Sequence, residues 1–178
     1  TMKKYVMYFC TTSSYVKSTL CFATADNIEG PYTYVDTILY SGYGKSNISE
    51  TNLYDVLGKN ADISRYLEYG GYNNKEWPNC IDPAIFTDAD GRMWMNYGSW
   101  SGGIFLLEID PTTGYPIYPV DDKDADPYYG YRLIGGGHHS AEGPYIQYDA
   151  ENGYYYLFVS YGDLQSDCLL YTSDAADE

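Results

Sequence analysis

Short runs of alternating or apolar residues recur along the chain and are separated by clusters of glycine, aspartate and asparagine. Alternation with a period of two is the mark of a half-buried β-strand, and Gly, Asp and Asn are typical turn residues. Many short strands with frequent turn signals are typical of an all-β sandwich, barrel or propeller. The pattern predicts strands over residues 3–10, 19–24, 32–39, 83–87, 91–98, 103–109, 143–148 and 153–161.

Two dipeptides predict tight turns between consecutive strands, Asp90-Gly91 and Asn152-Gly153. We expect the second to form a type I′ hairpin turn, because that turn needs positive φ at both central residues and Asn-Gly adopts it readily. One segment departs from the strand pattern, since apolar residues between 53 and 67 have rough helical spacing. This spacing predicts a short helix within a long insertion between residues 42 and 77.

An internal repeat is the most informative feature of the sequence. Residues 82–98 align with residues 142–158, and each copy has an acidic residue, a proline, a short strand, an Asp/Asn-Gly turn and an aromatic-rich strand. Residues 4–9 match the second strand of this unit alone. Repeats roughly 60 to 90 residues apart, each with a few antiparallel strands, predict propeller blades with loop insertions.

The repeat places Asp82 and Glu142 at equivalent positions in two units. The first strand of each propeller blade lines the central axis, so equivalent residues of successive blades converge at one end of the channel. Two carboxyl groups brought together are what cleavage of a glycosidic bond requires, one of them protonated to donate to the leaving oxygen. A neighbouring negative charge and partial burial both favour a protonated carboxyl. The alternative is that the two acids only cap turns at strand starts, as acids before proline often do.

Charge and composition narrow the range of ligands. The 178 residues include 10 Lys and Arg against 25 Asp and Glu, a formal net charge of -15. This charge repels phosphate backbones and anionic membranes, so we expect no nucleic-acid or membrane partner and a neutral ligand instead. The 24 tyrosines, against 5 Phe and 3 Trp, suit strands and sugar-binding clefts. The acidic run over residues 121–126 predicts a solvated loop, with a surface cation site as the alternative.

The two ends of the chain give separate predictions. Residues 1–9 already have a strand pattern, and no secretory signal peptide is visible in the sequence. Residues 168–178, CLLYTSDAADE, resemble the translation of a transposon-type sequencing adapter. We therefore expect residues 1–167 to be part of a domain that is cut at both ends, and residues 168–178 to be read-through that is not native.

Four motifs, in order and with fitting spacing, resemble glycoside hydrolase family 43, specifically its endo-arabinanase-like members. They are Cys21–Tyr32, Asn79–Pro83, Tyr97–Ile104 and His139–Ile146. The match covers nearly all of residues 3–167. Each motif alone is weak, but four of them in the family's order are fairly specific.

The resemblance implies a five-bladed β-propeller, of which about half, two to three blades, is present here. It implies an inverting hydrolase of arabinofuranosyl linkages in plant polysaccharide, either arabinan or arabinoxylan. By motif, Glu142 resembles the general acid, and Asp82 resembles the aspartate that acts as pKa modulator and positions the substrate. The family's general base lies in the first blade, upstream of residue 1, so we expect it to be missing here. A partial ring leaves blade edges open, and we expect the isolated chain to be neither stably folded nor active.

The resemblance also implies an extracellular or periplasmic protein. We assign no cofactor or metal within this chain, because Cys10, Cys21 and Cys80 have no zinc or redox spacing. The histidine that holds a central calcium in the family belongs to a later blade, so calcium is an expectation for the full-length protein only. An arabinofuranosidase or xylosidase of the same family and a non-catalytic polysaccharide-binding propeller stay open as alternatives. A related fructan-processing propeller fits the motifs less well.

Five further residues near the two acids are candidate sugar contacts, since a hydroxyl there would hydrogen-bond a furanose and an indole would stack on its apolar face. They are Trp77, Asn79, Ser99, Trp100 and His139. The alternative for Ser99 and Trp100 is a tight turn that covers the core. The alternatives for His139 are loop structure and metal binding.

Overall fold

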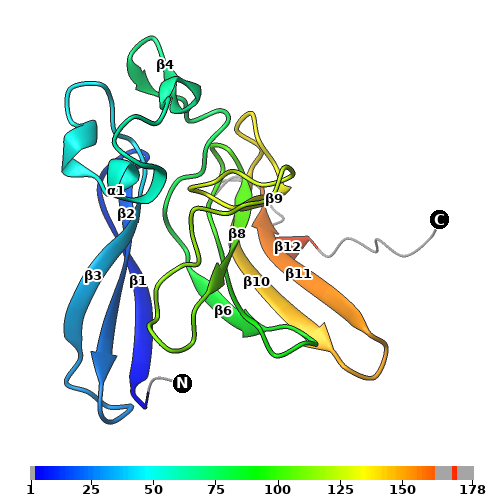
Figure 1. Cartoon of the computed structure of the whole chain (residues 1–178). Coiled ribbons are helices and arrows are strands. Elements are labelled where there is room, and N and C mark those ends of the chain that lie inside the picture. The colour runs from blue at the N-terminus through cyan, green and yellow to red at the C-terminus, as the bar shows by residue number, and fades with distance from the viewer. Residues whose placement is uncertain (1–2, 163–169, 172–178) are drawn as a thin grey trace.

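The computed structural model describes residues 3–162 and 170–171, which form antiparallel sheets arranged side by side (Figure 1). The three larger sheets have the orders β1-β2-β3, β6-β7-β8-β9 and β10-β11-β12, so each strand pairs with its neighbour in sequence, as in a propeller blade. Their bounds are β1 Tyr5–Ser14, β2 Lys17–Ala25, β3 Thr33–Tyr40, β6 Ala84–Thr87, β7 Met93–Tyr97, β8 Ile104–Ile109, β9 Tyr131–Ile134, β10 Ala141–Asp149, β11 Tyr154–Tyr161 and β12 Leu170–Tyr171.

The all-β prediction is confirmed, and every predicted strand is present. The sequence pattern missed β9 and the short pair β4, Leu67–Glu68, and β5, Gly71–Tyr72. Three of the four residues of β9 are exposed, so no alternation of buried and exposed positions marks it as a strand. The segment predicted to be adapter read-through lies outside the described residues except for β12.

The turn at Asn152-Gly153 is not the predicted type I′ turn. Asp149 ends β10 and pairs with Tyr154, the first residue of β11, so the connection is longer than two residues. Within it only Gly153 has positive φ, at 75°, whereas type I′ needs positive φ at both central residues. The Asp149 carboxylate accepts hydrogen bonds from the backbone N–H groups of Glu151 and Asn152 and from the side-chain amide of Asn152. These bonds stabilise the longer turn.

The insertion between β3 and β6 carries only short helices. They are the 3₁₀-helices η1, Ile48–Glu50, and η2, Ser64–Tyr66, and the α-helix α1, Leu53–Leu57. The short helix predicted within the insertion is present as α1. It ends at Leu57, where Gly58, with φ 92°, follows and donates its N–H to the Tyr54 carbonyl. Within the described residues, no helix has the length and apolar character needed to cross a membrane.

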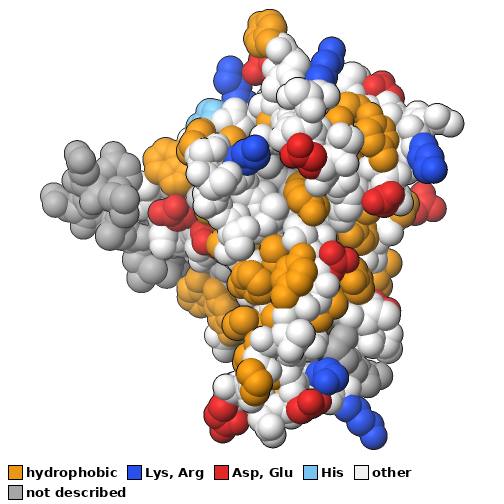
Figure 2. All heavy atoms as spheres, turned by 90° about the vertical axis from the view of Figure 1, so that its left-hand side faces the viewer, with side chains coloured by type: hydrophobic (Ala, Val, Ile, Leu, Met, Phe, Trp, Pro, Cys, Tyr) orange, Lys and Arg blue, Asp and Glu red, His pale blue; other side chains and the backbone are white. Residues whose placement is uncertain are grey.

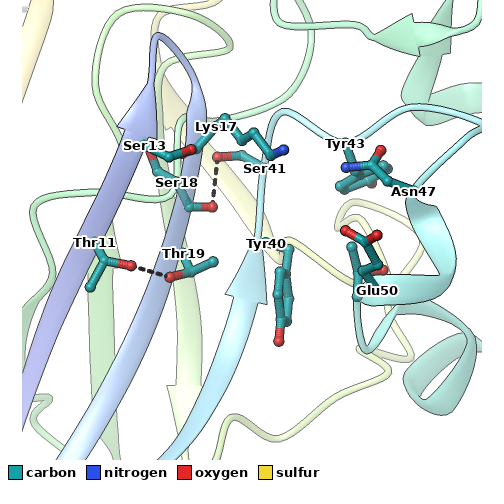
Figure 3. Close-up of a pocket in the computed structure, with 11 residues that line it drawn as sticks. Thr11, Ser13, Lys17, Ser18, Thr19, Tyr40, Ser41, Tyr43, Asn47 and Glu50 are labelled. Atoms are coloured by element: carbon teal, nitrogen blue, oxygen red, sulfur yellow. Dashed lines mark hydrogen bonds between the residues drawn. The ribbon is translucent and has the colours of Figure 1, made fainter.

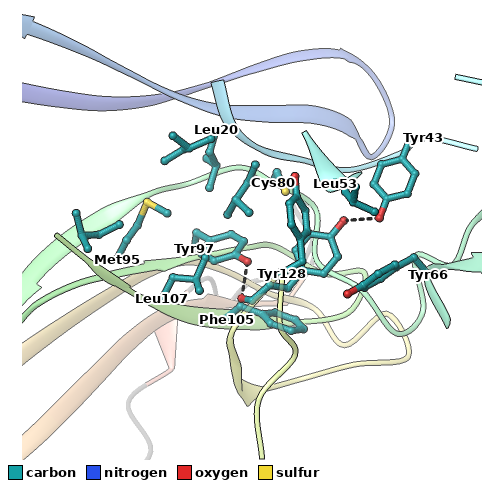
Figure 4. Close-up of a cluster of buried hydrophobic side chains, with 14 of the residues drawn as sticks. Leu20, Tyr43, Leu53, Tyr66, Cys80, Met95, Tyr97, Phe105, Leu107 and Tyr128 are labelled. Carbon is teal, nitrogen blue, oxygen red and sulfur yellow. Dashed lines mark hydrogen bonds between the residues drawn. The ribbon is translucent and has the colours of Figure 1, made fainter. Parts of the chain in front are cut away.

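Tyrosines make up much of the core that the first two sheets and the insertion share (Figure 4). Tyr66, Tyr97, Tyr128 and Tyr129 are each at most 1% exposed. Their hydroxyls are hydrogen-bonded, as buried polar groups must be: Tyr97 donates to the Tyr129 carbonyl at 2.8 Å, and Tyr129 to the Tyr40 carbonyl at 2.7 Å. The phenols thus fill the core and also join one element to the next, which phenylalanine would not do.

Apolar side chains also gather on the outward side of the first sheet, as Figure 2 shows. Sheets in a propeller pack face to face, so apolar residues on both faces of a sheet are typical of a blade. Exposed apolar side chains on the first and third sheets include Tyr5, Met7, Tyr34, Val35, Tyr145, Tyr154, Tyr155, Tyr156 and Phe158.

Asp126 corrects the prediction that the whole acidic run is a solvated loop. Residues 121–124 are exposed, but Asp126 is 5% exposed. Its carboxylate accepts the Tyr66 hydroxyl at 3.1 Å and the N–H groups of Tyr128 and Tyr129, and it lies 3.2 Å from Nη2 of Arg65. Burial raises the pKa of Asp126, against the lowering effect of the two N–H groups and the guanidinium. Asp126 therefore ties the insertion to the connection between β8 and β9.

We predict that Asp126→Ala lowers the free energy of unfolding of the full-length protein by about 3 kcal/mol, because buried donors lose their acceptor. Urea unfolding measures the change. The matched control is Asp124→Ala, whose side chain is 72% exposed and whose loss should change stability by less than about 0.5 kcal/mol. Equal losses in the two variants would contradict the role given to Asp126.

Candidate active site

Asp82 lies two residues before the first residue of β6, in a backbone conformation that few residues adopt. Its φ is 55°, in the left-handed region that aspartate and asparagine enter more readily than other non-glycine residues. The N–H of Gly98 donates to the Ile81 carbonyl at 2.9 Å and holds this bend against the end of β7. The carboxyl group is half-buried. Burial raises the pKa of Asp82, the N–H of Gly143 opposes this shift, and the negative charge of Glu142 adds to it.

Glu142 lies at the start of β10, opposite Ser160 of β11. The strand pairing is irregular between Glu142 and Tyr145, and Gly143 has φ 60°, so the strand bends immediately after the acid. The Ser99 hydroxyl donates to Oε2 of Glu142 at 3.3 Å. The other carboxyl oxygen, Oε1, has no hydrogen-bond partner among the described residues, and the side chain is partly exposed.

Four hydrogen bonds join the three short segments around the two acids. Besides the Gly98–Ile81 and Ser99–Glu142 bonds, the N–H of Trp100 donates to the Ala141 carbonyl at 2.8 Å and the N–H of Gly143 donates to Oδ2 of Asp82 at 3.3 Å. We refer to these bonds, among residues 81–82, 98–100 and 141–143, as the hydrogen-bond circuit. The structure thus brings Asp82 and Glu142 to one place, as their equivalent positions in the repeat predict.

The turn over residues 98–103, which supplies three of the donors, has a strained backbone. Trp100 and Ser101 have φ of 39° and 33°, which non-glycine residues rarely adopt. A Cβ at Gly98, where φ is 112°, would collide with the Gly103 carbonyl. Strain of this kind persists only where the surroundings hold it, and it clusters at active sites.

The remaining predicted contacts divide into two groups. Ser99 and Trp100 belong to the hydrogen-bond circuit, and the exposed His139 lies in the loop just before it. The side chains of Trp77 and Asn79 make their contacts elsewhere. Trp77 stacks on Tyr129, with ring centroids 5.7 Å apart, and Asn79 is buried with Oδ1 3.5 Å from a serine hydroxyl. These contacts tie both residues to the core.

Tyr15 was not predicted to lie near the site. It is at the tip of the β1–β2 hairpin, is 68% exposed, and its hydroxyl lies 3.5 Å from Nδ1 of His138. The backbone N–H of His138 in turn donates to the Ser101 carbonyl at 3.0 Å. The first sheet therefore reaches the loop that precedes Glu142. In a sequence with 24 tyrosines, residue type alone could not single out this one.

A cavity of about 180 Å³ lies between the first sheet and the insertion (Figure 3). Hydroxyl groups, Tyr40, Lys17 and Glu50 line it, and none of its lining residues belongs to the hydrogen-bond circuit. It is therefore separate from the candidate active site. Within the part of the chain that the structure describes, no group of three or more His, Cys, Asp or Glu side chains is placed to hold a metal ion.

Propeller blades that join two carboxyl groups at the starts of their first strands have the architecture of the propeller glycosidases. The family model described as glycosyl hydrolases family 43 matches residues 39–177, and the chain belongs to this family. The resemblance of the four sequence motifs to this family is thereby confirmed.

Relatives of known name are similar over most of the chain. An extracellular endo-α-(1→5)-L-arabinanase of Thermotoga petrophila is 41% identical over 162 residues, which are 90% of this chain and 30% of that protein. Extracellular endo-α-(1→5)-L-arabinanase 2 of Bacillus subtilis is 40% identical over 165 residues, 92% of this chain and 29% of that protein. The crystal structure of the Thermotoga petrophila endo-1,5-α-L-arabinanase aligns with a TM-score of 0.67 at 40% identity, covering 91% of this chain and 31% of that one.

The chain spans about 30% of the length of these curated relatives. A family 43 glycoside hydrolase structure from Bacillus licheniformis gives the same TM-score, 0.67, at 37% identity. The expectation that the sheets are blades of a family 43 five-bladed propeller is confirmed.

Asp82→Asn tests the effect of burial on the Asp82 carboxyl. A raised pKa means that the folded state binds the proton more tightly than the unfolded chain does. Protonated Asp82 therefore adds to the free energy of unfolding below the unfolded pKa, roughly 3.9, and this contribution is lost as the pH rises through the folded pKa. Asparagine stays uncharged and tolerates positive φ. We therefore predict that Asp82→Asn is at least as stable as the wild type at neutral pH and loses this advantage as the pH falls toward about 4. Urea unfolding across this range measures it, and a variant less stable at neutral pH would contradict the assignment.

Proposed function

We propose that this protein hydrolyses α-1,5-linked arabinofuranosyl bonds in arabinan, as an endo-acting, inverting glycoside hydrolase. The observation that carries the proposal is the hydrogen-bond circuit, which holds Asp82 and Glu142 together at the starts of two first strands. The names of the relatives that are 40–41% identical, both endo-arabinanases, support the choice of substrate and the endo mode of cleavage.

Glu142 is the general acid in this mechanism. Its O–H bond breaks as the proton moves to the glycosidic oxygen, and the electron pair of the C1–O bond leaves with that oxygen. A water molecule attacks C1 from the opposite face of the sugar ring. A carboxylate base takes one proton from that water. The new C1–OH bond has inverted configuration because the water attacks on the face opposite the leaving oxygen.

Asp82 has a supporting role beside the acid. It accepts the N–H of the residue that follows Glu142, whereas the acid and base of an inverting enzyme stand roughly 6.5–9.5 Å apart with the scissile bond and water between them. We assign to Asp82 the tuning of the acid and the positioning of the substrate. The base comes from another blade of the propeller, in keeping with the family resemblance.

The net charge of the chain and the names of its relatives support a neutral substrate and an extracellular location. A formal net charge of -15 suits a neutral polysaccharide. Both curated relatives are named extracellular, so we place this protein outside the cell as well.

A central calcium belongs to the proposal for the full-length protein. The described residues offer no ligand group for it, so we assign it no step.

The experiment that tests the proposal is hydrolysis of debranched arabinan by the full-length protein, compared with xylan and arabinoxylan. Arabino-oligosaccharides of several lengths are expected from arabinan and no products from xylan. Release of arabinose alone would replace endo by exo action. Binding of arabinan without hydrolysis would overturn the proposal in favour of a non-catalytic polysaccharide-binding propeller.

We predict that Glu142→Gln lowers kcat on arabinan by roughly 10²- to 10⁴-fold, because the amide has no proton to donate. Glutamine still accepts the Ser99 hydrogen bond, so the affinity for arabino-oligosaccharides, measured by calorimetry, should change little. Glu151→Gln, in the exposed turn between β10 and β11, is the matched control and should keep the wild-type rate. Wild-type turnover by Glu142→Gln would remove Glu142 from the acid role.

A further inference from the structure

Ser99 lies buried where the turn over residues 98–103 meets β10. It is 4% exposed, and its hydroxyl donates to Oε2 of Glu142 at 3.3 Å. The next residue, Trp100, donates its N–H to the carbonyl of Ala141, the residue before Glu142, at 2.8 Å. Two consecutive residues of the turn therefore bond to two consecutive residues of β10. This double contact fixes the position of the hydroxyl relative to the carboxyl group.

The two carboxyl oxygens of Glu142 therefore have different surroundings. Oε2 accepts a hydrogen bond from a buried hydroxyl, whereas Oε1 has no partner among the described residues. In a protonated carboxyl group, one oxygen carries the hydrogen and the other is left as an acceptor. An O–H donor that points at Oε2 favours the acid form in which Oε1 carries the proton.

We infer that Ser99 is a positioning residue that keeps the transferable proton of Glu142 on Oε1 and stabilises the carboxylate once that proton has left. The inference rests on the proposed function, since it assigns a role within the same proton transfer. During the step the Oε1–H bond breaks, the proton goes to the glycosidic oxygen, and negative charge develops on the carboxylate. The Ser99 hydroxyl keeps its own proton, and its hydrogen bond strengthens because the acceptor becomes charged.

Because Ser99 is buried, its hydroxyl acts on Glu142 and does not bind the sugar directly. A side chain that is 4% exposed and already bonded to Glu142 has little surface to offer a ligand. Removal of the hydroxyl should therefore slow the proton transfer and leave substrate affinity almost unchanged. A sugar-binding hydroxyl would have the opposite effect, a higher KM.

The test compares Ser99→Ala with the wild type in the full-length protein on two substrates. One is an unmodified arabino-oligosaccharide, whose leaving alcohol needs protonation, and the other is a 2,4-dinitrophenyl arabino-oligosaccharide, whose phenolate leaves without it. We expect kcat on the unmodified substrate to fall roughly 10- to 100-fold, with KM within about twofold of the wild type. On the dinitrophenyl substrate, kcat should stay within about threefold.

Two further variants keep the result interpretable if Ser99→Ala disturbs folding. Ser99→Thr retains a hydroxyl and should recover most of the lost rate on the unmodified substrate. Ser101→Ala is the matched control, because Ser101 is 1% exposed in the same turn and its hydroxyl has no hydrogen-bond partner among the described residues. It should leave both rates unchanged.

Equal losses on the two substrates, or a raised KM with an unchanged kcat, would overturn the role of Ser99. Full activity of Ser99→Ala on both substrates would do the same and leave the proposed function intact. A wild-type protein that hydrolyses neither substrate would overturn the proposed function, and the role of Ser99 with it.

Discussion

Four hydrogen bonds hold the starts of β6 and β10 against the turn that follows β7, and the placement of both acids depends on them. Three of the bonds involve a backbone group next to an acid, so the chain itself is fixed on either side of Glu142. This matters because Asp82 is partly removed from water and lies near the negative charge of Glu142, and both effects raise the pKa of Asp82. The circuit holds the two acids together despite both effects.

The core supports the circuit through the insertion. The N–H of Gly102 donates to the Trp77 carbonyl at 3.0 Å, and a Cβ at Gly102 would collide with the backbone of residues 76 and 77. Trp77 stacks on Tyr129, whose N–H donates to the buried Asp126 carboxylate. A continuous set of contacts therefore runs from the tyrosine core through the insertion to the strained turn and on to Glu142.

The sequence was sufficient to predict most strands of the blades and the meeting of the two acids, because strand alternation and an internal repeat are visible in the sequence itself and map directly onto a propeller. It was insufficient for Asp126, whose neighbours in the acidic run are exposed and whose partner Tyr66 is 60 residues away. The Ser99–Glu142 bond was also beyond prediction. It depends on a turn in which Trp100 and Ser101 both have positive φ, a conformation that neither residue type favours.

The central claim is that the hydrogen-bond circuit holds the acid of an inverting glycosidase. The most direct test is to follow, by proton NMR, the first anomer released when the full-length protein cleaves an α-1,5-linked arabino-oligosaccharide. The account predicts that the β-anomer appears first and the α-anomer only later, through mutarotation. Initial release of the α-anomer would show retention through a carboxylate nucleophile and would contradict the account.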